Sequence, residues 1–365
     1  MDHLAWIVDA STRTPLAEDE IRQHMAPALV AAINPTLAAL GPLTLVRKVS
    51  ATQAVVRVAG QDHLLRLQVD EQGLVDNVDL NVDEPPISWP ELDDRLAALG
   101  ARASFAAATV VAGQSEIVHG RDADVQRPIG SGFKLYVLGA LAQAVADGKA
   151  AWDEPLAIRD DWRSPFSRIL ETRPTGTELT LAEHADAMMW VSDNTATDHL
   201  IHHLGRDAVQ RQFALFGHDR PDTNNPLLTT KEFFQRKVGG AEPLDPRVTW
   251  SEPRDIDEVE YFASAADVCR AYAGLLAMDQ PEIGRALGKA DEGLNLDASL
   301  FTTVWFKPGR ETGVQSQNYL ARTADGRAFA VSLLVSDPLV AFDINDMTAR
   351  GLSVIRHAFG LLSPL

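Results

Sequence analysis

The pattern of hydrophobic and polar positions divides the chain into two parts. Over residues 17–40, apolar residues at helical spacing predict one or two helices, interrupted by Pro35. Four strand-like runs follow, separated by short turns: residues 43–49, 52–60, 63–70 and 74–82. Helices followed by a strand meander predict a small α+β domain with a curved sheet over residues 1–86. The adjacent prolines within residues 83–88 stop both helix and strand pairing, so this segment is the predicted linker.

Residues 87–365 carry a longer and more mixed pattern. Ser88 and Glu91 form a capping box before a helix over residues 91–99, and a long helical run begins near Gly130. Strand-like runs lie both early and late in this part: residues 103–112, 115–120, 300–307, 317–323 and 328–336. Helices placed between early and late strands of one sheet predict a second domain of the α/β (α+β) type.

Composition narrows the classes of function. The chain has 365 residues, with 51 acidic and 33 basic side chains and a formal charge of -18. Such a surface repels nucleic acid and anionic membranes, so neither is expected as a partner. The first residues lack a basic leader region and no run of about 18 apolar residues occurs. A cytoplasmic protein is therefore expected, unless a leader has already been removed.

Ser131 and Lys134 are the first candidates for chemistry. They stand three residues apart at the start of the long predicted helix, so the hydroxyl and the ammonium share one face. A serine hydroxyl becomes a nucleophile when a nearby base takes its proton, and lysine is such a base only with a lowered pKa. A helix N-terminus favours neutral lysine. Alone, this spacing is also typical of an ordinary surface pair.

Two further motifs follow in a fixed order. Ser192-Asp193-Asn194 begins 61 residues after Ser131 (192 − 131), and Lys307-Pro308-Gly309 begins 115 residues later (307 − 192). The order Ser-x-x-Lys, Ser-Asp-Asn, Lys-x-Gly is the signature of class A β-lactamases and penicillin-binding proteins. Residues 87–365 therefore resemble the serine β-lactamase and penicillin-binding-protein superfamily. The resemblance implies an antiparallel sheet with a helical subdomain.

The resemblance also implies roles for the residues of the first two motifs. Ser131 would be acylated and Lys134 would take its proton. Ser192 would relay a proton toward the leaving group. Asn194 would hold the amide side chain of the substrate.

The third motif supplies the other side of the implied site. Lys307 would attract a substrate carboxylate and influence the pKa of Lys134, and Gly309 would belong to the substrate-binding strand. The backbone N–H groups of Ser131 and Arg310 would form the oxyanion hole. Pro308 departs from the family, which has Thr or Ser there, because it offers neither a hydroxyl nor a backbone N–H.

A second departure concerns hydrolysis of the acyl-enzyme. Class A enzymes carry a water-activating glutamate after the Ser-Asp-Asn motif, whereas residues 194–223 contain none. Asp207 and Asp222 are two acids available there, the first at a helix start and the second in a turn. Weak turnover of penicillins is therefore expected.

The first domain extends the resemblance. A small α+β domain ahead of such a hydrolase resembles the architecture of a clavulanic-acid-biosynthesis protein and its relatives, whose front domain is a steroid-isomerase-like or cyclase-like cone. Residues 60–80 carry this likeness. Because a fold does not transfer a function, a structural or substrate-docking role is favoured for this domain.

Three alternatives compete with this hypothesis. His199, His202 and His203 lie one turn apart, but no carboxylate or cysteine completes a zinc site, so neither a metal nor a cofactor is expected. Cys269 lies in an apolar helical run, where a packed thiol is expected. The segment around Ser131 also lacks the G-x-S-x-G turn of α/β-hydrolases.

The favoured function is an acyl-serine hydrolase that acts on a small molecule, either a β-lactam-type amide or an ester. A peptidase or transpeptidase for D-amino-acid peptides is an alternative within enzymes. A non-catalytic penicillin-binding or sensory module is the alternative of another class. The sequence gives no oligomeric state.

Overall fold

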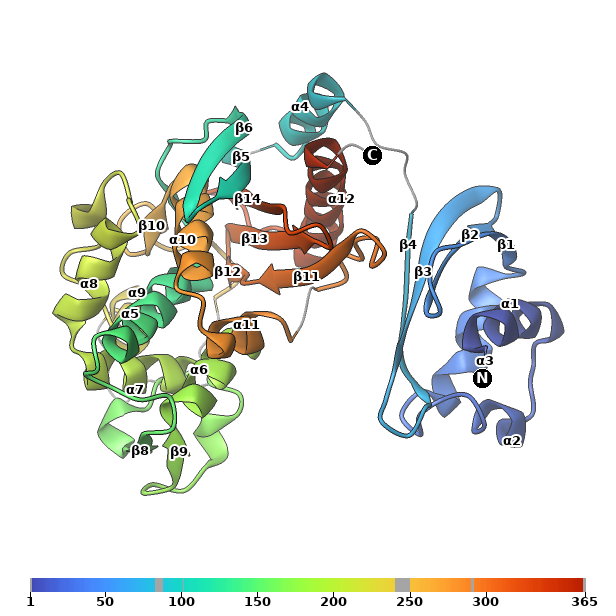
Figure 1. Ribbon diagram of the computed structural model, residues 1–365, viewed down its shortest axis with the longest axis horizontal. Coiled ribbons are helices and arrows are strands. Elements are labelled where there is room, and N and C mark those ends of the chain that lie inside the picture. The colour runs from blue at the N-terminus through green and yellow to red at the C-terminus, as the bar shows by residue number, and fades with distance from the viewer. Residues whose placement is uncertain (1, 83–87, 101, 240–249, 290–291, 364–365) are drawn as a thin grey trace. The chain divides into compact units, whose positions relative to one another are not determined.

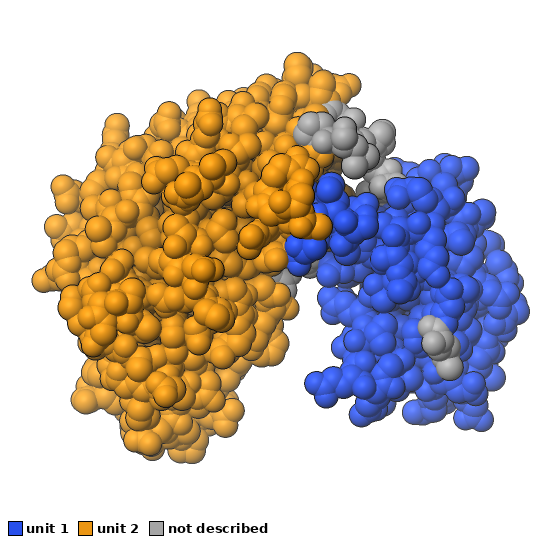
Figure 2. All heavy atoms as spheres, in the orientation of Figure 1, with its two compact units in different colours: residues 1–86, 295–302 blue, residues 87–294, 303–365 orange. Residues whose placement is uncertain are grey.

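The computed structural model describes residues 2–82, 88–100, 102–239, 250–289 and 292–363 (Figure 1). The chain forms two compact units, residues 1–86 with 295–302 and residues 87–294 with 303–365 (Figure 2). The predicted boundary coincides with this division at residue 86, but 295–302 was assigned to the second domain. Gln53 explains the difference: its side chain donates to Leu296 O (3.5 Å) and accepts from Ala298 N (3.3 Å). The predicted linker lies, apart from Ser88, outside the described residues.

The first unit is a four-stranded antiparallel sheet with three helices. The strands lie in the order β1-β2-β3-β4: β1 Thr44–Lys48, β2 Gln53–Val58, β3 Gln61–Val69 and β4 Val75–Val82. The helices are α1 His3–Arg13, α2 Glu18–Ile21 and α3 Val30–Leu40. No helix was predicted at α1, although Leu4, Ile7 and Ala10 lie three apart and are buried in this unit's core. The meander of four strands agrees with the sequence pattern.

Two details of this unit test the local predictions. Pro35 does not interrupt the helix, because α3 continues through it and keeps Ile33 and Leu37 in the core. A proline removes one helical hydrogen bond, and burial of this apolar face outweighs that loss. The turn between β3 and β4 forms as predicted: Asp70 Oδ1 accepts from the backbone N–H groups of Gln72 and Leu74, both at 2.9 Å.

The second unit is built on a sheet in the order β11-β13-β14-β5-β6, with β12 paired to β13. Its strands are β5 Arg102–Val111, β6 Gln114–Arg121, β11 Phe301–Phe306, β12 Gly309–Glu311, β13 Val314–Thr323 and β14 Ala328–Ser336. The pairings of β5 with β6 and β14, and of β13 with β12 and β14, are antiparallel. This matches the predicted sheet of early and late strands.

Two helices cover the sheet on opposite faces. Cys269 of α10 (Ala265–Ala277) lies against the carbonyl groups of Ala106 and Ala330. α12 (Ile344–Leu362) instead packs Gly351 onto Leu333 of β14, a strand on which residues 330 and 333 point to different faces. The central strands β13, β14 and β5 are therefore buried on both faces, whereas the residues of the edge strand β6 are exposed or half-buried.

The remaining helices form a subdomain beside the sheet, around α5 (Lys134–Ala146) (Figure 1). They are η1 Gly130–Phe133, α6 Leu181–Trp190, α7 Asn194–Leu204, α8 Arg206–Leu215, α9 Thr230–Lys237 and α11 Pro281–Leu287, while α4 Trp89–Ala98 lies against α12. Short elements link them: β7 Arg127–Pro128, β8 Pro155–Ala157, η2 Asp160–Trp162, η3 Leu170–Thr172, β9 Glu178–Thr180, η4 Pro221–Asn224 and β10 Phe262–Ala263. The capping box predicted at Ser88 is present. None of the described helices is both long and apolar enough to span a bilayer.

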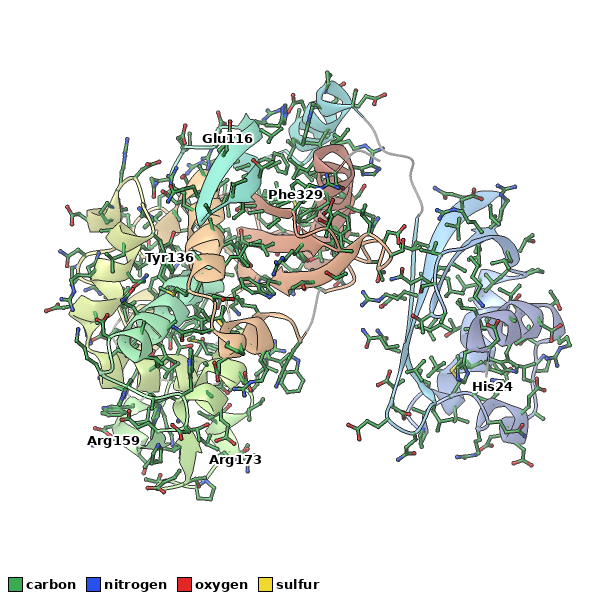
Figure 3. All side chains as sticks on the ribbon, viewed as in Figure 1. His24, Glu116, Tyr136, Arg159, Arg173 and Phe329 are labelled. Carbon is green, nitrogen blue, oxygen red and sulfur yellow. The ribbon has the colours of Figure 1, made fainter. Side chains whose placement is uncertain are left out.

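Aromatic packing holds α5 in place. Tyr136 of α5, labelled in Figure 3, is fully buried and stacks on Phe213 with ring centres 3.9 Å apart. The ring of Phe216 lies between α5 and α10. A Cβ atom on either Gly139 or Gly274 would lie 2.4 Å from this ring. Glycine at both positions thus allows the two helices to close on one aromatic side chain.

This packing makes a prediction for Gly139→Ala. Alanine normally stabilises a helix interior by about 1 kcal/mol over glycine, but here we expect destabilisation of about 1–3 kcal/mol by overpacking. Urea unfolding measures the change. In a Phe216→Leu background the same substitution should cost less, and an equal cost in both backgrounds would refute the proposed contact.

Candidate functional site

A cavity of about 560 Å³ in the second unit gathers most of the predicted residues. Five of the seven line it: Ser131, Ser192, Asn194, Lys307 and Arg310. They come from η1, the α6–α7 connection, the start of α7, the end of β11 and β12. Lys134 and Gly309 do not line the cavity. Both are buried behind its wall.

Lys134 lies fully buried at the first position of α5. Its ammonium donates to Ser192 O (2.6 Å), Asn194 Oδ1 (2.8 Å) and Ser192 Oγ (3.1 Å). Ser131 Oγ makes no hydrogen bond to any described residue. Lys134 is therefore hydrogen-bonded directly to the second motif. The proton transfer predicted from Ser131 to Lys134 has no hydrogen bond between these two side chains in this structure.

Burial determines the charge of Lys134. Its pKa is lowered to about 7: desolvation is the largest cause, Asp193 and Asp198 oppose it, and the positive charge of Arg168 adds to it. A lysine with this pKa is neutral in about half of the molecules at pH 7. It can accept a proton under ordinary conditions, which a solvated lysine cannot.

Asp193 holds the loop that carries Ser192. Its buried carboxylate accepts four backbone N–H groups, those of Arg168, Ile169, Leu170 and Ala196, at 2.8–3.0 Å. Burial by itself would raise the pKa of Asp193, but these hydrogen bonds outweigh it and lower the pKa. Ser192 has a φ of 59°, a left-handed conformation that costs a non-glycine residue about 1–2 kcal/mol. The Asp193 contacts offset this strain.

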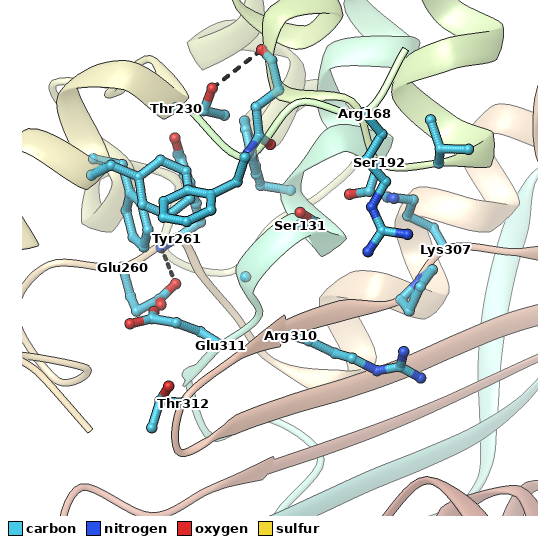
Figure 4. A pocket seen from close by; sticks show the side chains of 18 of the residues that line it. Ser131, Arg168, Ser192, Thr230, Glu260, Tyr261, Lys307, Arg310, Glu311 and Thr312 are labelled. Atoms are coloured by element: carbon cyan, nitrogen blue, oxygen red, sulfur yellow. Dashed lines mark hydrogen bonds between the residues drawn. The ribbon is translucent and has the colours of Figure 1, made fainter. Parts of the chain in front are cut away.

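Lys307 forms a cationic wall with two arginines. It is fully buried, and its ammonium contacts only Met189 O at 3.5 Å among the described residues. Burial, followed by the charges of Lys134 and Arg168, lowers its pKa well below the usual value. Arg168 and Arg310 also line the cavity, and Figure 4 shows Arg168 directed toward the same space as Lys307. An anionic group placed here would relieve the repulsion among these cations.

Gly309 contributes through its lack of a side chain. A Cβ atom on it would lie 1.9 Å from Ile129 O, and one on Gly130 would lie 3.2 Å from Arg310 N. These close approaches bring the backbone of β12 against η1, next to Ser131. The predicted oxyanion hole requires this juxtaposition of Ser131 and Arg310.

Pro308 provides no replacement for the hydroxyl that the family has at this position. It separates β11 from β12 and lines the cavity without a hydroxyl or an N–H. The nearby hydroxyl of Thr312 donates to Trp250 O (2.9 Å). Among the described residues of the cationic wall, Arg168 and Lys307 are therefore the cations that no carboxylate already pairs, whereas Arg310 is paired with Glu292.

The cavity also contains acids that the motifs did not predict. Glu260, Glu292 and Glu311 line it, whereas Asp207 lies in the first turn of α8 and Asp222 in η4, both away from the lining. Glu292 pairs with Arg310. These glutamates lie outside the interval in which the family places its water-activating residue, so sequence order gave no signal for them.

The histidines of α7 and Cys269 have structural roles. His199 is buried, with Nδ1 donating to Thr195 O (2.7 Å) and Nε2 accepting from Arg159 N (2.9 Å). Both ring nitrogens are therefore occupied, and His202 stacks on Trp162 at 4.9 Å. Burial raises the pKa of the Cys269 thiol to about 12, which leaves it unreactive.

Comparison with known proteins shows which family the second unit matches. The profile described as "Beta-lactamase enzyme family" matches residues 90–352. A β-lactamase structure from Sphaerobacter thermophilus is 22% identical, with a TM-score of 0.57, over 76% of this chain and 99% of that one. One from Chitinophaga pinensis is 17% identical, with a TM-score of 0.57, over 75% and 98%. The structure of PBP-A is 18% identical, with a TM-score of 0.54, over 76% and 99%.

These matches confirm the predicted β-lactamase-like fold, with its antiparallel sheet and helices. None of the curated proteins matches the chain. The family match begins at residue 90, so the likeness of residues 1–86 to an isomerase-like or cyclase-like cone stays a prediction.

The anchoring role of Asp193 predicts a stability effect. Asp193→Asn replaces the charge and turns an NH₂ group toward backbone donors, so we expect a loss of at least about 2 kcal/mol at pH 7 in urea unfolding. Because the folded-state pKa of Asp193 is lowered, its contribution exists above about pH 4 and is lost as the pH falls. The two proteins should therefore converge in stability under acid conditions.

Asp207→Asn provides the control, since Asp207 is exposed on α8 and should change stability by less than about 0.5 kcal/mol. An Asp193→Asn protein as stable as this control at pH 7 would show that the loop does not depend on the carboxylate.

Proposed function

The chain belongs to the beta-lactamase enzyme family, and from this we propose that it is an acyl-serine hydrolase with Ser131 as nucleophile. Its substrate would be a β-lactam-type amide or an ester. The observation that carries the proposal is the environment of Lys134. This lysine is buried, its pKa is about 7, and it lies about one helical turn from Ser131 in the chain. Its side chain is hydrogen-bonded to Ser192 and Asn194.

Acylation would proceed through these groups. Ser131 Oγ attacks the substrate carbonyl, and its proton passes to neutral Lys134. The backbone N–H groups of Ser131 and Arg310 stabilise the negative charge on the carbonyl oxygen. Ser192, at 3.1 Å from Lys134 Nζ, then gives its hydroxyl proton to the leaving group and takes in its place the proton that Lys134 had accepted. Each transfer moves one proton, and the lysine is restored at the end.

The cationic wall supports an anionic substrate. Lys307, Arg168 and Arg310 face one cavity, and after burial the charges of Lys134 and Arg168 hold the pKa of Lys307 down. A carboxylate bound there would lose its water but gain charge-assisted hydrogen bonds, which are about twice as strong as neutral ones. β-Lactams carry such a carboxylate beside the reacting amide.

The direct test is covalent labelling of Ser131. We expect a β-lactam or a fluorophosphonate to add one acyl or phosphonyl group, located on Ser131 by intact mass and peptide mapping. Ser131→Ala should abolish the label, and Lys134→Ala should slow it by about 10²–10⁴-fold, the usual contribution of a general base. Labelling that survives Ser131→Ala would refute the proposal.

The acyl-enzyme is expected to break down slowly with penicillins. No glutamate occupies the interval after Asn194, and removal of a positioned base typically costs about 10²–10⁴-fold in the step it serves. A chromogenic cephalosporin in stopped flow should give a burst of about one equivalent and then weak turnover. An activated ester, with a smaller acyl group, should turn over faster.

Rapid turnover of the cephalosporin without a burst would contradict this expectation. It would mean that another acid of the cavity activates water, and Glu311→Gln would then be the variant to examine first.

A further inference from the structure

An acidic pair lies in the same cavity as the cationic wall. Glu311, the last residue of β12, and Glu260, which precedes β10, both line the cavity, and their carboxyl groups point toward each other (Figure 4). Their side chains are 8% and 0% exposed. In the view of Figure 4, Ser131 lies between this pair and the group formed by Arg168 and Lys307.

The charges of this pair are not balanced. Lys237 is the only cation paired with them among the described residues, with its ammonium 3.0 Å from Glu311 Oε1 and 3.7 Å from Glu260 Oε1. One ammonium therefore serves two carboxylates. A buried charge without a partner is costly, and the pair reduces this cost by keeping a proton: burial, followed by the charge of Glu311, raises the pKa of Glu260 well above its usual value.

The carboxylate oxygens of the pair also lack hydrogen-bond donors. Apart from the proton that the two carboxyl groups share, no described residue donates a hydrogen bond to either carboxylate oxygen of Glu311 or to Oε1 of Glu260. The ion pair with Lys237 lacks hydrogen-bond geometry, and the Lys237 ammonium donates instead to Arg254 O. Buried carboxylate oxygens are normally satisfied, and one shared proton cannot satisfy all three, so Glu311 keeps an oxygen for which a donor is missing.

Aromatic side chains supply a second feature that suits a cation. The cavity wall includes Phe166, Phe234 and Trp250, whose rings pack on one another with centres 4.6–6.5 Å apart. Lys237 already lies 5.2 Å from the ring centre of Phe233. Aromatic faces attract ammonium groups, most strongly where water is excluded.

We propose that Glu311 and Glu260 bind an ammonium group of the substrate, on the side of the reacting carbonyl opposite the carboxylate held by Lys307 and Arg168. The substrate class would then be zwitterionic acyl donors. An ammonium group would replace the shared proton, so that two cations face two carboxylates, and it would donate to the free oxygens of Glu311. This inference rests on the proposed acylation of Ser131.

Three penicillins test the proposal, because they share the ring carboxylate and differ in one acyl substituent. Ampicillin carries an α-ammonium group, benzylpenicillin a hydrogen and carbenicillin a carboxylate. The second-order rate constant for acylation of Ser131 is measured by intact mass at pH 6.5. We expect ampicillin to react at least about tenfold faster than benzylpenicillin and carbenicillin to react slowest.

Glu311→Gln isolates the contribution of the pair. It leaves Lys237 balanced by Glu260, so the fold should persist, and thermal unfolding checks this; Glu260→Gln, which leaves Lys237 balanced by Glu311, is the second variant. The preference for ampicillin over benzylpenicillin should fall to about twofold or less in the variant. Glu258→Gln, an exposed glutamate two residues before Glu260, is the control and should keep the wild-type ratio.

The outcomes separate the two hypotheses. An ampicillin preference that is absent in the wild type, or unchanged in both Gln variants, overturns the ammonium site while Ser131 remains a nucleophile. If no penicillin reacts but a fluorophosphonate does, the same comparison is made with fluorophosphonates bearing ammonium and neutral tails. Failure of every probe to label Ser131 refutes the proposed function and the inference with it.

Discussion

The burial of Lys134 is the constraint on which the site depends. An ammonium group removed from water loses several kcal/mol of solvation unless it is paired or neutral. Lys134 reaches neither a carboxylate nor solvent, and its three donors end on two oxygens of Ser192 and one of Asn194. The Lys134 ammonium therefore loses its proton near neutral pH. That condition turns Ser131, a poor nucleophile by itself, into a candidate for acyl transfer.

The surrounding structure keeps this condition from relaxing. Asp193 fixes the segment before α7 and the turn at residues 168–170 with one carboxylate, so Ser192 stays in a left-handed conformation beside Lys134. The tight contact of Gly309 with Ile129 holds β12 against the turn that carries Ser131. Phe216 packs between α5 and α10 and fixes α5, the helix that begins at Lys134. Rigid elements on three sides thus position a small group of polar atoms.

Sequence order was sufficient to predict which motifs meet. Ser131, Ser192 and Lys307 lie far apart in the chain, and their spacing in the family pattern predicted one site. The fold class followed from the same motifs and from the early and late strands. The helix at residues 3–13 was not predicted, because residues 4–8 are apolar without a break and hide the helical spacing of the buried positions.

Other parts of the site depend on contacts that no local pattern encodes. The four backbone N–H groups at Asp193 come from two segments, and the approach of Glu260 to Glu311 joins residues 51 positions apart (311 − 260). Arg168 enters the cavity from an irregular segment between η2 and η3. Pro35 remained inside a helix for a similar reason, since tertiary burial decided what local propensity opposed.

The most direct measurement of the central claim is the titration of Lys134 itself. NMR of the protein labelled with ¹³C at lysine Cε, with the signal assigned by its loss in Lys134→Arg, reports the protonation of this one ammonium group. We expect a midpoint near pH 7, in line with the pKa of about 7 that burial imposes. A midpoint near the ~10.4 of a solvated lysine would contradict the account, because Lys134 would then be charged whenever Ser131 needed a base.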